Sequence, residues 1–311
     1  MKKILLTVDG SIESLEAARF LAHLPFREPV ELVVVTAIPE EHSQKTFLVD
    51  GWGQTWKTRK RHAADQAFEQ VREIFHEAGL REPFLHQRSV HLTQVVREGV
   101  PGKTIVAIAN EHQPDLLVVG SKRHSAVSRV LLGSTSDHVA THVGCSVLVV
   151  RANSRTSDHS LFQIAIGYEP SEASENAVNE LADYGWASQS EVRVLTVTDK
   201  MDAQVPSQEP ALEWLENVVE RFRHVFANVQ CKLIHCDHIG DGLVDYIDTH
   251  PVDLVVVGES PRSGFDRLDL GSTTRFVLRH SISSVWIARE RAVHKHRELR
   301  GTSSLQRCGI P

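Results

Sequence analysis

Short runs of aliphatic residues alternate along the chain with stretches in which apolar residues recur every three or four positions. The runs are typical of buried β-strands, and the wider spacing is typical of helices with one buried side. Val30–Ile38, for example, is mostly Val and Leu, as in a strand that is covered on both faces. Strands that alternate with helices in this way predict a parallel sheet with helices on both faces.

This pattern predicts five strands and four helices in the first half of the chain, and the same order in the second half. In the first half we expect strands at residues 4–8, 30–38, 84–90, 115–119 and 146–150, and helices at 14–24, 63–78, 103–112 and 134–142. In the second half we expect strands at 163–166, 191–197, 230–235, 253–257 and 285–288. The fold class is therefore α/β, with two doubly wound five-stranded domains.

The second half also repeats the residues of the first. Asp-Leu-Leu-Val-Val-Gly at 115–120 matches Asp-Leu-Val-Val-Val-Gly at 253–258, and Leu-Gly-Ser-Thr recurs at 132–135 and 270–273. Both matches have an offset of 138, whereas Ser11 and Ser171 match at an offset of 160. The first half therefore carries 22 extra residues, which we expect at 39–62. We expect domain 1 at 1–152, a polar linker at 153–160, domain 2 at 161–290 and a basic, mobile tail at 291–311.

Composition narrows the classes of function. The length of 311 residues suits two domains of about 150 residues each. A net charge of −6 provides no basic field for a nucleic acid or an anionic membrane, so we expect neither as a partner. The four cysteines lack the spacing of a disulfide framework or a zinc site. With no signal peptide and no apolar run near the ~20 residues of a membrane span, we expect a cytoplasmic protein without a bound metal.

Two segments stand where such sheets bind ligands. Doubly wound sheets bind at the carboxyl ends of their strands, where the strand order reverses. Asp9-Gly-Ser follows the first expected strand, and Gly120-Ser-Lys-Arg123 follows the fourth. We therefore expect these two segments to meet in one crevice.

The same residues resemble a known family. Val8-Asp9-Gly10-Ser11, the segment 115–120, and Leu132-Gly133-Ser134 before a helix are similar to motifs of the universal stress protein family. The resemblance covers both halves, so the chain looks like a tandem member. It implies the strand order 3-2-1-4-5 and a pairing of domains through their last strands. Residues 147–150 and 285–288 would then meet across a pseudo-twofold axis as an intramolecular pseudo-dimer, and further homo-oligomers stay open.

Part of that family binds ATP through Gly-x2-Gly-x9-Gly-Ser/Thr, so the resemblance implies ATP with Mg²⁺ in domain 1. Glycine allows the backbone to approach a phosphate, and the N–H groups of a helix start bind an anion. Carried onto this chain, the resemblance implies that Asp9 meets the adenosine and the backbone near Ala37 meets the adenine edge. It also implies that Gly120 and Lys122 lie along the phosphates. The helix start would close over the phosphates with Gly133, Ser134 and Thr135.

The chain departs from this motif at its second glycine. Arg123 stands there in domain 1 and Pro261 in domain 2. The Arg123 charge either crowds the phosphates or replaces the missing backbone contact, and proline removes a donor. Domain 2 also has Glu169 and Pro170 where domain 1 has Asp9-Gly10. A nucleotide is therefore expected in domain 1 rather than in domain 2.

Structural explanations compete for several of these residues. Ser134-x-x-Asp137 resembles a capping box, and Asp9 suits a turn. The basic run 57–62 is interpreted as a solvated helix end, with contact to a partner, a nucleic acid or a membrane as the alternative. His138 and His142 are interpreted as structural.

The sequence therefore favours a regulatory, ligand-binding protein of the stress response with no catalytic residues. The first alternative is an enzyme that uses the same crevice, either a slow ATPase or a nucleotidyl-transfer enzyme. The second is an assembly module in which both crevices have lost their ligand.

Overall fold

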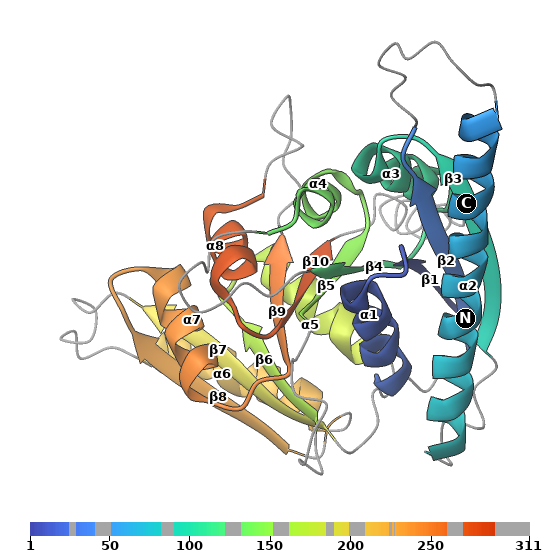
Figure 1. The fold of residues 1–311 in the computed structure, drawn as a ribbon. Helices are drawn as coiled ribbons and strands as arrows, with labels where there is room; N and C mark the ends of the chain where they lie inside the picture. The colour runs from blue at the N-terminus through green and yellow to red at the C-terminus, as the bar shows by residue number, and fades with distance from the viewer. Residues whose placement is uncertain are drawn as a thin grey trace, which may run out of the picture.

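The computed structural model is a single ten-stranded sheet between two layers of helices (Figure 1). It describes residues 1–24, 29–40, 51–81, 90–121, 132–151, 162–184, 190–198, 209–223, 226, 228–259 and 270–289. No helix among these residues is long and apolar enough to cross a membrane.

Among the described residues, each half contributes five strands and four helices in strict alternation. The first half consists of β1 (Lys2–Thr7), α1 (Ile12–His23), β2 (Val30–Ile38), α2 (Gly51–Arg81), β3 (Val90–Glu98), α3 (Pro101–His112), β4 (Leu116–Ser121), α4 (Ser134–His142) and β5 (Ser146–Arg151). The second consists of β6 (Phe162–Gly167), α5 (Glu172–Asp183), β7 (Ser190–Thr198), α6 (Glu209–Phe222), β8 (Asn228–His235), α7 (Ile239–Thr249), β9 (Leu254–Glu259), α8 (Ser272–His280) and β10 (Ser284–Arg289).

The strand order is β3-β2-β1-β4-β5-β10-β9-β6-β7-β8. Each half thus has the order 3-2-1-4-5 with parallel neighbours, as expected. Both faces of the sheet are covered because the strands carry apolar side chains on both sides. α1, α2, α5 and α6 pack on one face, and α3, α4, α7 and α8 on the other. Each core layer continues across both halves.

The two halves meet through their last strands, which confirms the expected pseudo-dimer. β5 and β10 pair in antiparallel fashion, with Val147 opposite Ile287 and Val149 opposite Val285. Beside this pair, Trp286 donates a hydrogen bond to Glu180 at 3.2 Å, and its ring meets that of Tyr184 edge-on at 4.9 Å. Pairing of these strands removes an exposed edge from each half.

Two arginines, the buried Arg151 and the half-buried Arg289, bind across this junction. Arg289 of β10 donates to the carbonyl oxygens of Val143 at 3.0 Å and Cys145 at 3.3 Å, and to that of Ala140. Arg151 of β5 donates to the carbonyl oxygen of Leu278 in α8. Each arginine therefore binds the carboxyl end of the last helix of the other half, where carbonyl groups lack helical partners.

Two expectations about the first half were wrong. A strand was expected at 84–90, but β3 runs over Val90–Glu98, and residues 84–89 lie outside the described part. β3 is an edge strand whose side chains are largely half-buried, so its hydrophobic pattern is weak. A helix was expected at 63–78, but α2 begins at Gly51 and takes up part of the 22-residue insertion. The linker 153–160 and the tail 291–311 also lie outside the described residues.

Candidate functional site

The first half contains a cavity of about 310 Å³ at the carboxyl ends of β1, β2 and β4. The strand order reverses here, because β2 lies on one side of β1 and β4 on the other. Asp9, Ala37, Gly120 and Thr135 all line this cavity, so the fold brings together four of the residues that the sequence assigned to a ligand. A volume of this size lies at the lower end of the ~300–1,000 Å³ range of small-molecule pockets.

The other assigned residues lie at or beyond the edge of this cavity. Gly133 and Ser134 are exposed at the start of α4, immediately before Thr135. Lys122 and Arg123 lie outside the described residues, as does Pro261 of the second half.

Asp9 is held by its own loop. Its Oδ1 accepts hydrogen bonds from the backbone N–H of Ser11 at 3.0 Å and from the Ser11 hydroxyl at 2.5 Å. Burial alone would raise the pKa of Asp9, but the hydrogen bonds from Ser11 and Ser14 outweigh burial and hold this pKa below its ordinary value. The turn explanation of Asp9 is therefore correct, and the same loop fixes an ionised carboxylate at the cavity wall.

Gly120 is required by packing. A Cβ atom at this position would overlap the carbonyl oxygen of Glu13, at the start of α1. The Ser136 hydroxyl also donates to the carbonyl oxygen of Gly120 at 2.9 Å, which joins α4 to the end of β4. This glycine would therefore be needed even without a ligand.

The start of α4 differs from the expected capping box. The N-cap is Gly133, which has no side-chain cap hydrogen bond, and Ser134 is the first helical residue. Since Ser134 is not the N-cap, its hydroxyl is not in position to cap the first turn. Asp137 N–H bonds to the Gly133 carbonyl, so the N–H groups of residues 134–136 precede the first helical hydrogen bond. These donors lie beside the cavity.

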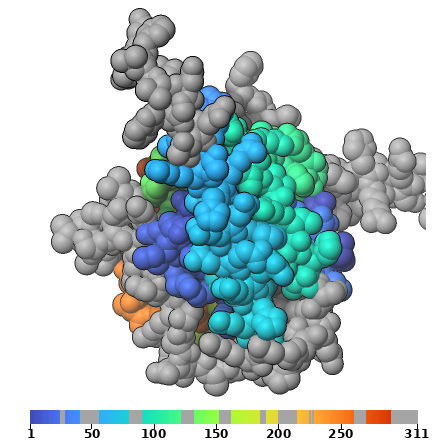
Figure 2. All heavy atoms as spheres, turned by 45° about the vertical axis from the view of Figure 1, so that its right-hand side comes forward, coloured from blue at the N-terminus to red at the C-terminus, as the bar shows by residue number. Residues whose placement is uncertain are grey.

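The inserted helix contributes residues that the sequence analysis missed. Lys60 and Ala64 of α2 line the cavity. Glu98, at the end of β3, anchors the helix by ion pairs with Lys57 at 2.9 Å and Arg61 at 3.6 Å. Figure 2 shows α2 lying along the face of domain 1, with β3 beside it. Two residues of the basic run therefore pair with Glu98 and hold α2 against β3, which brings the exposed residue Lys60 to the edge of the cavity.

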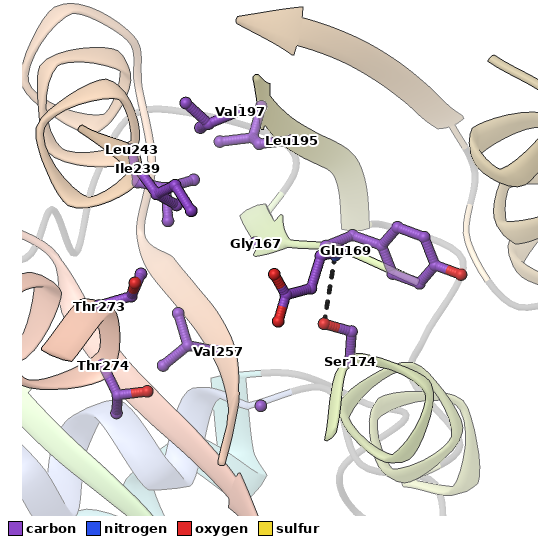
Figure 3. A pocket seen from close by; sticks show the side chains of 12 residues that line it. Gly167, Glu169, Ser174, Leu195, Val197, Ile239, Leu243, Val257, Thr273 and Thr274 are labelled. Atoms are coloured by element: carbon purple, nitrogen blue, oxygen red, sulfur yellow. Dashed lines mark hydrogen bonds between the residues drawn. The ribbon is translucent and has the colours of Figure 1, made fainter. Parts of the chain in front are cut away.

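The second half has a much smaller pocket at the equivalent place, with a volume of about 90 Å³. Figure 3 shows the Glu169 side chain directed into it, opposite the apolar side chains of Ile239, Leu243 and Val257. The backbone N–H of Glu169 donates to the Ser174 hydroxyl at 3.2 Å, as Asp9 N–H does to Ser14 at 3.4 Å. None of the described residues that line this pocket carries a positive charge.

The histidines on α4 have a packing role. The rings of His138 and His142 stack with their centres 4.0 Å apart, and His138 lies against Gly102 of α3. Phe276 lies against Gly240 in the same way in the second half. Within the described ranges, no three His, Cys, Asp or Glu side chains gather as a metal site.

Comparison with known proteins identifies the family. The model of the universal stress protein family matches residues 1–151 and 162–289. A universal stress protein of Mycobacterium tuberculosis is 26% identical over 303 residues, which cover 92% of this chain and 97% of the relative. One from Mycolicibacterium smegmatis is 27% identical over 305 residues, covering 93% and 97%.

Solved structures agree with the fold. A universal stress protein from Archaeoglobus fulgidus superposes with a TM-score of 0.66 at 17% sequence identity, over 92% of this chain and 98% of that one. The family match extends over both halves and nearly the whole length. The chain therefore belongs to the universal stress protein family and carries two copies of its domain.

Proposed function

We propose that this protein is a cytoplasmic regulator of the stress response whose domain-1 crevice binds an adenine nucleotide. One observation carries the proposal: Asp9, Ala37, Gly120 and Thr135, which the family motif assigns to the nucleotide, line one cavity of about 310 Å³. The corresponding pocket of domain 2 has about 90 Å³ and is too small for the same ligand.

The groups around the cavity suit the parts of such a ligand. The ionised Asp9 carboxylate accepts hydrogen bonds from sugar hydroxyls, and the backbone at Ala37 faces the edge of the base. The unpaired N–H groups at the start of α4 attract the phosphates, and the Lys60 ammonium adds a positive charge. ATP brings Mg²⁺ on its phosphate oxygens.

The binding signal has a physical route to the second domain. Thr135 in the first turn of α4 lines the crevice, while Ala140 and Val143 at its other end accept hydrogen bonds from Arg289 of β10. A ligand that shifts α4 therefore acts on the junction between the domains. We propose that the protein holds and releases its ligand without turnover.

Isothermal titration calorimetry tests the proposal with ATP and Mg²⁺, AMP and cAMP. AMP and cAMP are the ligands in solved structures of two other family members. Thr135→Glu adds a carboxylate at the second residue of α4, where negative charge favours the helix but repels phosphate. The matched control is Thr273→Glu, the equivalent position on α8.

We expect one bound nucleotide per chain. Thr135→Glu should weaken binding by at least about tenfold, or roughly 1.4 kcal/mol, and Thr273→Glu should leave it unchanged. A wild-type protein that gives no binding signal with any of the three nucleotides refutes the proposal and favours the assembly module. Phosphate release over many turnovers favours the alternative of a slow ATPase.

A further inference from the structure

A buried carboxylate lies at the start of α8 in domain 2. Glu259 ends β9, is only 9% exposed, and its Oε1 accepts a hydrogen bond from the backbone N–H of Gly271 at 2.8 Å. Gly271 is the N-cap of α8. A negative charge is stabilised there by the helix dipole and by the free N–H groups of the first turn.

The Glu259 carboxylate and the Arg289 guanidinium attract each other without a direct ion pair. Burial lowers the pKa of the Arg289 guanidinium, and the Glu259 carboxylate opposes this shift. The Oε2 atom of Glu259 is buried and, among the described residues, has no hydrogen-bond partner. A charged group with one unsatisfied oxygen is costly to bury, so its place at a helix start needs an explanation.

Domain 1 has a small neutral residue at the equivalent place. The offset of 138 relates Glu259 to Ser121, Gly271 to Gly133, and Arg289 to Arg151. The Ser121 hydroxyl lies 3.4 Å from Nη1 of Arg151 and brings no charge to the start of α4. In domain 2 the carboxylate of Glu259 therefore binds the start of α8. In domain 1 the equivalent residue, Ser121, is neutral and brings no such charge to the start of α4.

The pocket beside α8 agrees with this difference. It is lined by Thr273 and Thr274 from the first turn of α8, and Glu169 points into it (Figure 3). Glu169 lines this pocket, and the buried Glu259 carboxylate binds the N–H of Gly271 at the start of α8. A phosphate placed here would meet negative charge, and like charges repel more strongly in a partly buried site than in water.

We propose that Glu259 is an internal anion that takes the phosphate position at the start of α8 and thereby excludes phosphate-bearing ligands from domain 2. The start of α8 is then closed to an outside anion by a side chain of the same domain. The proposal concerns domain 2 alone and holds whether or not domain 1 binds a nucleotide.

Titration with sodium phosphate tests this, with the backbone amide of Gly271 followed by nuclear magnetic resonance. Glu259→Ser introduces serine, the residue that domain 1 has at the equivalent position 121, beside Arg151. Glu259→Gln removes the charge but keeps the size and the hydrogen-bond acceptor, and is the variant to use if the serine variant does not fold. Glu216→Ser on α6 removes the same charge from an exposed position, and sodium chloride at equal ionic strength controls for salt.

In the wild type and in Glu216→Ser, the Gly271 amide should not respond to phosphate beyond the salt control. In Glu259→Ser it should show a saturable shift, and in Glu259→Gln a smaller one. A wild-type Gly271 amide that saturates like the variants overturns the proposal, and so does the lack of any response in both Glu259 variants. Failure of nucleotide binding in domain 1 would leave these readouts unchanged.

Discussion

At the scale of single residues, two glycines determine how closely the helices approach the sheet. Gly120 is the penultimate residue of β4, and Gly258 occupies the same place in β9. A Cβ atom at either position would overlap a backbone carbonyl oxygen, that of Glu13 or of Ala173. Because a backbone group cannot rotate away as a side chain can, both sites require glycine for packing.

Gly120→Ala should therefore destabilise the fold by about 1–3 kcal/mol, because α1 must move away from β4. Equilibrium urea unfolding measures the loss. Gly144→Ala is the matched control, since nothing lies within 4 Å of a Cβ atom there, and it should change stability by less than about 0.5 kcal/mol. Equal stability of the two variants would contradict the packing explanation.

At the scale of helices and strands, a polar chain joins three elements of domain 2. The hydroxyl of Tyr168, after β6, donates to Glu175 of α5 at 2.5 Å, and Glu175 pairs with Arg221 of α6 at 2.7 Å. Burial, reinforced by the hydrogen bond to Glu175, raises the pKa of Tyr168 to about 12. The ordinary value is 10.0, so the folded protein holds this proton more tightly than the unfolded chain.

The contribution of Tyr168 to stability is therefore complete below about pH 10 and is lost as the pH rises towards about 12. Glu175→Gln should lower the pKa of Tyr168 towards 10 without reaching it, because burial remains. Absorbance of the phenolate measures this in a chain with three tyrosines, and Tyr168→Phe identifies the contribution of Tyr168. An unchanged titration curve in Glu175→Gln would show that the hydrogen bond has no such effect.

Elements with a strong hydrophobic pattern were predictable from the sequence. β2 and α4 have the expected bounds, because β2 is buried on both faces and α4 starts after a glycine. β3 was misplaced because an edge strand needs few apolar residues. The first turns of α2 were missed because they are polar and are held by Glu98, whose contact with Lys57 spans 41 positions.

The site was predictable only where a local motif marks it. Asp9 and Thr135 belong to segments that repeat or match the family, so their meeting at one crevice followed from topology. Lys60 and Glu259 carry no such mark. Lys60 reaches the cavity because Glu98 binds α2, and Glu259 binds the N–H of Gly271, and both partners are distant in sequence and near only after folding.

At the scale of the whole molecule, the junction of the two halves is both apolar and charged. β5 and β10 join the sheet, and the charged side chain of Arg289 from domain 2 binds carbonyl groups at the end of α4 in domain 1. Removing the Arg289 guanidinium leaves the carbonyl oxygens of Ala140, Val143 and Cys145 without this donor, which is costly where they are out of contact with water. We therefore expect the stability of the two halves to be coupled.

Arg289→Met should lower the free energy of unfolding by about 1–3 kcal/mol, because carbonyl groups at the end of α4 lose their donor. Urea unfolding followed by circular dichroism measures this. Arg223→Met is the control, because Arg223 is exposed and pairs with Glu220 one helical turn away, so its loss should cost less than about 1 kcal/mol. A change in Arg289→Met as small as that of the control would mean that the junction does not depend on this charge.

Because β5 and β10 pair within one polypeptide, the two halves can diverge in sequence independently. In a pair of identical chains, every mutation reaches both crevices at once, so neither can change without the other. Here a substitution such as that between Ser121 and Glu259 affects one half and leaves its counterpart intact. Each molecule therefore carries one copy of each crevice in a fixed one-to-one ratio, which an assembly of identical subunits cannot maintain.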